Sequence, residues 1–138
     1  MPTRVIFDTN AYSHLFRGDT DCAEVLQLFS RIGIPVIVMA ELLSGFERGN
    51  RYAQNVAKLE QFLTLPRVEL ILPDRDTAFA YSSLNTQLEK LGTPIPTNDI
   101  WIAALTLQHN DVLLTFDAHF SRINGLRFGV NATQLGLK

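Results

Sequence analysis

Short runs rich in valine, isoleucine and leucine alternate along the chain with longer segments whose apolar residues recur at helical spacing. The short runs are typical of buried parallel strands, and the longer segments are typical of helices that cover a sheet. The predicted strands are Arg4–Phe7, Val36–Val38, Val68–Leu72, Val112–Thr115 and Leu126–Val130. The predicted helices are Asn10–Phe16, Asp21–Ser30, Ala40–Arg48, Tyr52–Leu63, Asp74–Leu91 and Asn98–His109. This alternation predicts an α/β fold, a three-layer α/β/α sandwich around a central, mostly parallel sheet of about five strands.

Capping and turn residues support these helix boundaries. Asp21, with Glu24 three residues later, predicts an N-cap with its reciprocal partner. Thr97 stands where it can cap the last long helix, after a stiff loop that contains two prolines. The predicted helix terminators are Gly33, Gly49 and Gly92.

Length and composition point to one intracellular domain. A chain of 138 residues with 46% hydrophobic content can bury one core, and no repeat or linker divides it, so we expect a single domain over residues 1–138. No stretch reaches the roughly 20 apolar residues of a membrane helix, and the N-terminus has no signal-peptide pattern. We therefore expect a cytoplasmic protein without membrane contact. A single cysteine, Cys22, excludes an internal disulfide and a cysteine-rich zinc site.

The charge balance argues against a surface that is uniformly attractive to nucleic acid, because the formal net charge is −2. Most of the basic residues are arginine, whose guanidinium suits bidentate phosphate contacts. Arg48, Arg51 and Lys58 lie close together in the sequence. They either guide a phosphate backbone or form a solvated helix face, and the sequence leaves both interpretations open.

Four acidic residues fall where an open parallel sheet builds its sites, at strand ends and helix starts. Asp8 directly follows the first predicted strand, and Asp117 follows the fourth. Glu41 is placed at the beginning of the helix after the second predicted strand. Asp99 lies in the first turn of a helix whose following residues are too apolar for a solvent-facing surface. We therefore expect all four carboxylates at one rim of the sheet.

Converging carboxylates repel one another and call for a compensating cation. Oxygen ligands of this kind suit Mg²⁺, with Mn²⁺ as a plausible substitute, better than Zn²⁺. Phosphodiester hydrolysis is the reaction that such an ion supports most naturally. For Glu41 or Asp99 taken alone, stabilisation of a helix dipole explains the residue equally well, and Asp8 is also compatible with an Asx-turn.

Four segments resemble the motifs of PIN-domain nucleases, and among these the VapC-type toxins of bacterial toxin–antitoxin pairs. The segments are Val5-Ile6-Phe7-Asp8-Thr9-Asn10, Met39-Ala40-Glu41-Leu42-Leu43-Ser44-Gly45, Pro96-Thr97-Asn98-Asp99-Ile100-Trp101-Ile102-Ala103-Ala104 and Leu114-Thr115-Phe116-Asp117-Ala118-His119-Phe120. They occur in the family's order and span about residues 4–128. Each motif alone is weak, whereas four in register with the predicted elements are specific.

The resemblance implies a site and a function. The metal ligands that the resemblance implies are Asp8, Glu41, Asp99 and Asp117, with Thr9, Asn10 and Thr115 as supporting polar groups. The implied activity is metal-dependent endonucleolytic cleavage of RNA, commonly tRNA or ribosomal RNA. A homodimer and a VapB-type antitoxin are implied as well. One position departs from the pattern: many relatives carry a further acid where this chain has His119, which is interpreted either as a phosphate contact or as a surface histidine.

Other protein classes fit the sequence less well. A phosphate-accepting receiver domain needs a lysine beyond a late strand, and none is so placed. A haloacid-dehalogenase-type phosphatase would carry a second aspartate at the position of Asn10. The remaining alternatives to a toxin are a non-catalytic PIN-like binding module and a housekeeping RNA-processing nuclease.

Overall fold

In the computed structural model, which describes residues 3–137, five parallel strands form one sheet in the order β3-β2-β1-β4-β5. The strands are β1 (Arg4–Phe7), β2 (Arg31–Pro35), β3 (Val68–Ile71), β4 (Val112–Leu114) and β5 (Phe128–Gly129). The helices are α1 (Thr9–Phe16), α2 (Thr20–Leu28), α3 (Val36–Glu47), α4 (Tyr52–Leu63), α5 (Arg75–Lys90) and α6 (Thr97–Gln108), with a short 3-10 helix η1 (Ala118–Arg122). The predicted α/β architecture with a parallel sheet is confirmed.

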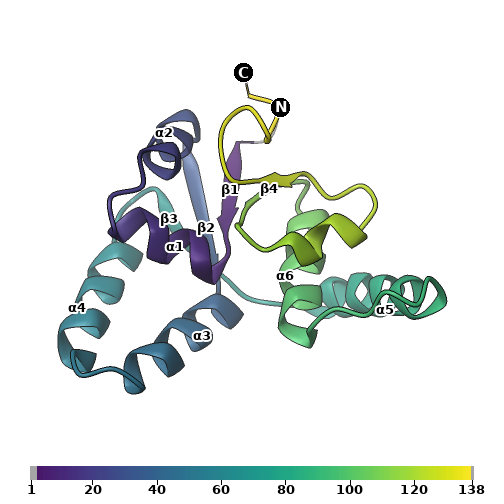
Figure 1. The fold of residues 1–138 in the computed structure, drawn as a ribbon, viewed down its shortest axis with the longest axis horizontal. Helices are drawn as coiled ribbons and strands as arrows, with labels where there is room; N and C mark the ends of the chain where they lie inside the picture. Colours follow the sequence, from purple (N-terminus) through teal and green to yellow (C-terminus); the bar gives the residue numbers. More distant parts are fainter. Residues whose placement is uncertain (1–2, 138) are drawn as a thin grey trace.

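The order of the strands creates a switch point beside β1. The chain builds the sheet outward in one direction, from β1 to β2 to β3, and then returns to add β4 on the other side of β1. Figure 1 shows α1 to α4 grouped on one side of β1 and the pair α5 and α6 on the other. In open parallel sheets, ligands bind beyond the carboxyl ends of the strands at such a reversal. A ligand site is therefore expected at the carboxyl ends of β1 and β4.

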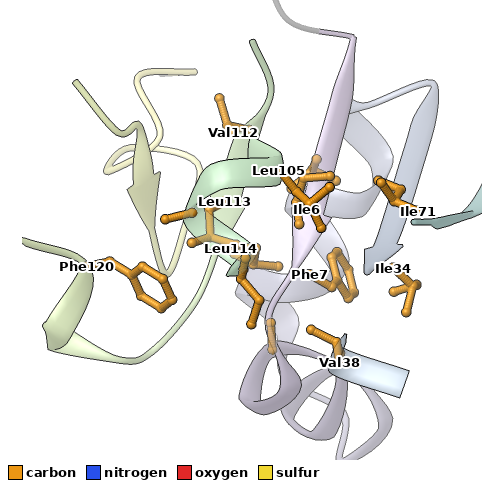
Figure 2. Packing of buried hydrophobic residues seen from close by; sticks show 14 of the residues in the cluster. Ile6, Phe7, Ile34, Val38, Ile71, Leu105, Val112, Leu113, Leu114 and Phe120 are labelled. Carbon is orange, nitrogen blue, oxygen red and sulfur yellow. The ribbon is translucent and has the colours of Figure 1, made fainter. Parts of the chain in front are cut away.

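The central strands are buried along their whole length. Every residue of β4 and the last three residues of β1 are fully buried, and these side chains gather with those of the covering helices in one core (Figure 2). Phe7 on β1 packs at 6.5 Å from Phe62 of α4, measured between ring centroids, and Tyr12 of α1 meets the same Phe62 ring edge-on. Such burial and ring packing hold the ends of β1 and β4 in a fixed position. Among residues 3–137, no helix has both the length and the apolar character needed to cross a membrane.

The prediction of a strand at Val36–Val38 is wrong. The second strand is formed by Arg31–Pro35, and Val36 already begins α3, four residues earlier than predicted. Pro35 lacks a backbone N–H and serves as the N-cap residue, so the strand ends and the helix starts there. The β-branched residues that follow Pro35 favour strands only weakly, and packing of α3 against the core overrides that preference.

Gly33 is not a helix terminator, as the sequence suggested, but lies within β2. A Cβ atom at this position would lie 2.3 Å from Cδ1 of Ile71 and 2.6 Å from Cδ1 of Ile6. Those two side chains, from the strands on either side, fill the space above the glycine. The residue is therefore required for packing within the sheet.

Two predicted caps are also wrong. Asp19, not Asp21, is the N-cap of α2, and its carboxylate accepts a hydrogen bond from the backbone N–H of Cys22. Thr97 is the first residue of α6, and the N-cap is Pro96, which makes no side-chain cap bond. The remaining helices and strands form within a few residues of their predicted positions.

Candidate metal centre

Asp8 connects β1 to α1 and is almost completely buried, with 4% of its surface exposed. Its Oδ1 accepts a hydrogen bond of 2.8 Å from the backbone N–H of Thr9, and its Oδ2 accepts one of 2.7 Å from the hydroxyl of Thr115. Burial raises the pKa of Asp8; the two hydrogen bonds oppose this shift, and the nearby Glu41 and Asp117 carboxylates add to it. Asp8 is thus both a helix cap and a buried acid with acidic neighbours.

Glu41 lies in the second turn of α3 and does not begin that helix, which corrects the sequence-based placement. Its Oε1 accepts a hydrogen bond of 2.7 Å from the hydroxyl of Thr9, and its Oε2 accepts one of 3.4 Å from the Asn98 side-chain amide. Interaction with a helix dipole is strongest in the first turn, so capping no longer explains this residue. Thr9 and Asn98 instead tie it to the residues next to Asp8 and Asp99.

The loop after β4 carries Asp117 and is held by two side chains. The hydroxyl of Thr115, which is 2% exposed, donates to Asp8 and accepts a 3.0 Å hydrogen bond from the backbone N–H of Asp117. The side-chain oxygen of Asn10 accepts a 3.0 Å hydrogen bond from the backbone N–H of Phe116. Through Thr115, the ends of two adjacent strands are joined at the point where their acids emerge.

His14 provides a further support for this loop that the sequence did not indicate. Its ring stacks on that of Phe116, with 3.8 Å between centroids and 12° between planes. The Nδ1 atom of His14 lies 3.2 Å from Oδ2 of Asp19, the N-cap of α2. A lone histidine on a helix gave no signal of such a contact, because its partner is more than a hundred residues away in the chain.

Asp99 lies in the first turn of α6 and is 8% exposed. The pKa of Asp99 rises from 3.8 to about 6, mainly because burial penalises the charged carboxylate and further because Asp8, Asp117 and Glu41 repel it. A hydrogen bond with His119 opposes the shift. The repulsion shows that all four predicted acids, from four separate segments of the chain, are close enough to influence one another.

These residues fit a divalent metal ion. The donor set consists of carboxylate oxygens, which hard divalent cations prefer. Burial, and to a lesser extent repulsion by the other acids, raises the pKa of Asp8 and of Asp99, so their charged forms are unfavourable when no cation is present. One imidazole, that of His119, lies among them, and its Nδ1 together with one oxygen each of Asp99 and Asp117 lies within a 4.8 Å span. The arrangement can concentrate positive charge where a phosphodiester would bind.

Two of the basic residues considered from the sequence, Arg48 and Lys58, line different hollows. Arg48 lines a hollow of about 320 Å³ together with Glu41, Ser44 and Asn98. Lys58 lines other hollows, beside α1 and α4. Arg48 therefore shares a hollow with one of the acids, Glu41.

Known proteins match this sequence over nearly the whole chain. The PIN domain family model matches residues 5–126. Ribonuclease VapC1 from Haemophilus influenzae (strain R2866) is 31% identical over 128 residues, which cover 89% of this chain and 94% of that protein. Ribonuclease VapC2 from Rickettsia felis is 36% identical over 104 residues, covering 75% of this chain and 76% of that protein.

Solved structures agree with these matches. The fold is similar to that of a chain in the crystal structure of VapBC2 from Rickettsia felis bound to a DNA fragment from their promoter. The TM-score is 0.81 and the sequence identity is 31%, and the match covers 91% of this chain and 97% of that one. It is also similar to a chain in DNA-bound VapBC from Salmonella typhimurium, with a TM-score of 0.82, 26% identity, and coverage of 94% and 98%.

Proposed function

Because this chain belongs to the PIN-domain family, we propose that it is a metal-dependent endoribonuclease that hydrolyses RNA phosphodiester bonds, and that it is the toxin of a toxin–antitoxin pair. The observation that supports this most strongly is the meeting of four carboxylates at the carboxyl edge of the sheet, in a chain whose relatives are named ribonucleases. Residues 1–138 act as one nuclease domain in this proposal. The cytoplasm, where bacterial RNA is found, is its place of action.

In this proposal, Asp8, Glu41, Asp99 and Asp117 hold Mg²⁺, for which Mn²⁺ can substitute. When bound, the ion supplies Lewis-acid stabilisation of the charge that develops on the scissile phosphate. Thr115 is the supporting residue at the centre, because its hydroxyl links the Asp8 side chain to the Asp117 backbone. It thereby fixes the separation of two acids that would otherwise move apart by mutual repulsion.

Arg48 is the basic residue that we assign to the substrate. It lines the same hollow as Glu41, at the edge of the acid cluster, and it is exposed. A guanidinium there binds a phosphate of the RNA backbone without reading its sequence. The proposed target, tRNA or ribosomal RNA, follows from the family resemblance alone.

A VapB-type antitoxin and a second copy of the chain are the proposed protein partners. Two hollows, of about 200 and 360 Å³, lie beside α1 and α4 and share Phe16 and Lys58. Phe16 and Leu65, which both line the smaller hollow, are 48% and 47% exposed, and exposed apolar side chains gathered in one place support a contact surface here. Co-purification with the product of the neighbouring small gene, followed by size-exclusion chromatography, tests both partners; a monomer that retains no partner would contradict this part of the proposal.

Cleavage of a mixed tRNA and ribosomal RNA preparation tests the enzymatic function. We expect EDTA to abolish cleavage, and excess Mg²⁺ or Mn²⁺ to restore it and to raise the melting temperature of the protein. Expression without antitoxin should arrest bacterial growth, and co-expression of the antitoxin should relieve the arrest. Full activity in EDTA would refute the metal centre, and unaffected growth at a high level of folded protein would refute the toxin.

A further inference from the structure

His119 lies in η1 and faces two of the acids. Its Nδ1 atom is 3.1 Å from Oδ1 of Asp117 and 3.3 Å from Oδ2 of Asp99. Its imidazole is 42% exposed, so one side of the ring meets solvent while the other meets the acid cluster. The other two histidines are placed differently: His14 stacks on Phe116, and His109 is an exposed residue at the far end of α6.

The position of His119 is fixed by the local backbone. Asp117 is the N-cap of η1, and its Oδ1 accepts a 2.9 Å hydrogen bond from the backbone N–H of His119. Two ligands that are adjacent in an octahedron with bonds of about 2.1 Å are separated by roughly 3.0 Å. The distances from Nδ1 to the oxygens of Asp117 and Asp99 match this separation closely, without any movement of the loop.

We propose that His119 is a metal ligand through Nδ1, and that this imidazole shifts the preference of the centre from Mg²⁺ toward Mn²⁺. The inference rests on the proposed metal centre and concerns which ion it selects. Mg²⁺ favours sites made of oxygen alone, whereas imidazole nitrogen suits the later divalent ions and Mn²⁺ accepts both kinds of donor.

Pulsed electron paramagnetic resonance of the Mn²⁺-loaded protein tests the ligand directly, because a coordinated imidazole nitrogen modulates the Mn²⁺ signal. The measurement belongs at about pH 8, where free imidazole is neutral and able to bind. We expect nitrogen modulation in the wild-type protein and in His109→Asn, a matched control that alters a histidine far from the acids. His119→Asp should bind Mn²⁺ without that modulation.

Calorimetric titration with Mg²⁺ and with Mn²⁺ tests the selectivity. We expect the ratio of the Mg²⁺ dissociation constant to the Mn²⁺ dissociation constant to fall by about tenfold or more in His119→Asp. The same ratio should stay unchanged in His109→Asn. Because these measurements use metal binding and not cleavage, they are independent of the RNA target.

The possible outcomes separate this inference from the proposed function. Mn²⁺ binding by the wild-type protein without nitrogen modulation would overturn the ligand role, and His119 would then be an ion-pair partner of the acids; the metal centre itself would stand. An unchanged selectivity ratio in His119→Asp would overturn the effect on ion preference. Failure of the wild-type protein to bind either ion would overturn the metal centre and this inference together.

Discussion

Replacing Asp99 with asparagine should abolish RNA cleavage and, at the same time, make the metal-free protein more stable. The side chain is 8% exposed and lies among three other acids, so its negative charge is unfavourable unless a cation is bound. Asparagine keeps the shape and most of the hydrogen-bonding capacity of aspartate while removing the charge. A residue that only stabilised its helix would show neither effect.

The pKa of Asp99 gives the size of the effect on stability. In the folded protein this pKa is about 6, compared with the ordinary value of 3.8, a difference of about two units that corresponds to roughly 3 kcal/mol. As the pH rises, the carboxyl of the unfolded chain ionises first, so the metal-free folded state loses stability from about pH 4 and the loss is complete above about pH 6. Asparagine removes this loss. At neutral pH the variant should therefore gain up to about 3 kcal/mol, or roughly 10 °C in melting temperature.

The assay pairs RNA cleavage with thermal melting in EDTA, at about pH 4.5 and at neutral pH, for the wild type and Asp99→Asn. The wild type should lose stability between these pH values, and the variant should lose less. Asp21→Asn is the matched control, because Asp21 is an exposed acid in the first turn of another helix. It should cleave normally and gain no stability. Near-normal cleavage by Asp99→Asn, or a melting temperature below that of the wild type at neutral pH, would refute the reasoning.

Three further substitutions test how the sheet and the site are held. Gly33→Ala should lower the free energy of unfolding by about 1–3 kcal/mol, because the added methyl group meets the side chains that fill the space above β2. Gly45→Ala, at an open position in α3, is the control and should raise the free energy of unfolding by roughly 0.5–1 kcal/mol. Similar urea denaturation curves for both variants would contradict the packing at β2. Asn10→Ala removes the acceptor that anchors the loop after β4, so kcat for RNA cleavage should fall with little change in KM, and an unchanged kcat would speak against that role. Asp111→Ala removes the 2.6 Å ion-pair partner of the buried Arg4 and leaves Glu69, at 3.5 Å, to compensate the guanidinium, so it should cost about 1.5–3 kcal/mol in urea denaturation; a loss below about 1 kcal/mol would show that Glu69 alone compensates Arg4.

The placement of the acids could be predicted because it depends on simple rules. A buried strand is recognised by its run of apolar residues, and a parallel sheet brings all strand ends to one edge. Asp8 follows such a run directly, Asp117 lies three residues after the end of β4, and β1 and β4 are neighbours in the sheet. The common edge of both acids therefore followed from the sequence once a parallel sheet was expected, whereas the adjacency of β1 and β4 is seen only in the structure.

The boundary between β2 and α3 could not be predicted by the same rules. Val36, Ile37 and Val38 have the side chains of a strand, but they form the first turn of a helix that packs on the core. Local preference is weaker than burial, and a short apolar run does not reveal which of the two structures buries it. The same error placed Glu41 at the start of a helix, which made a capping role look more plausible than the structure allows.

The side-chain partners of the acids were the least predictable part of the site, and they hold the acids in place. Thr9 and Thr115 could be named as supporting residues, but not which acid each hydroxyl contacts, because that depends on side-chain rotamers and on contacts between distant segments. The hydroxyl of Thr115 and the backbone N–H of Thr9 both lower the pKa of Asp8, and this pKa nevertheless remains raised. Neutral donors thus hold the carboxylates in place without neutralising them. In the proposed centre, the repulsion that remains is relieved when a cation binds, so the threonines contribute to metal affinity by keeping the acids close together.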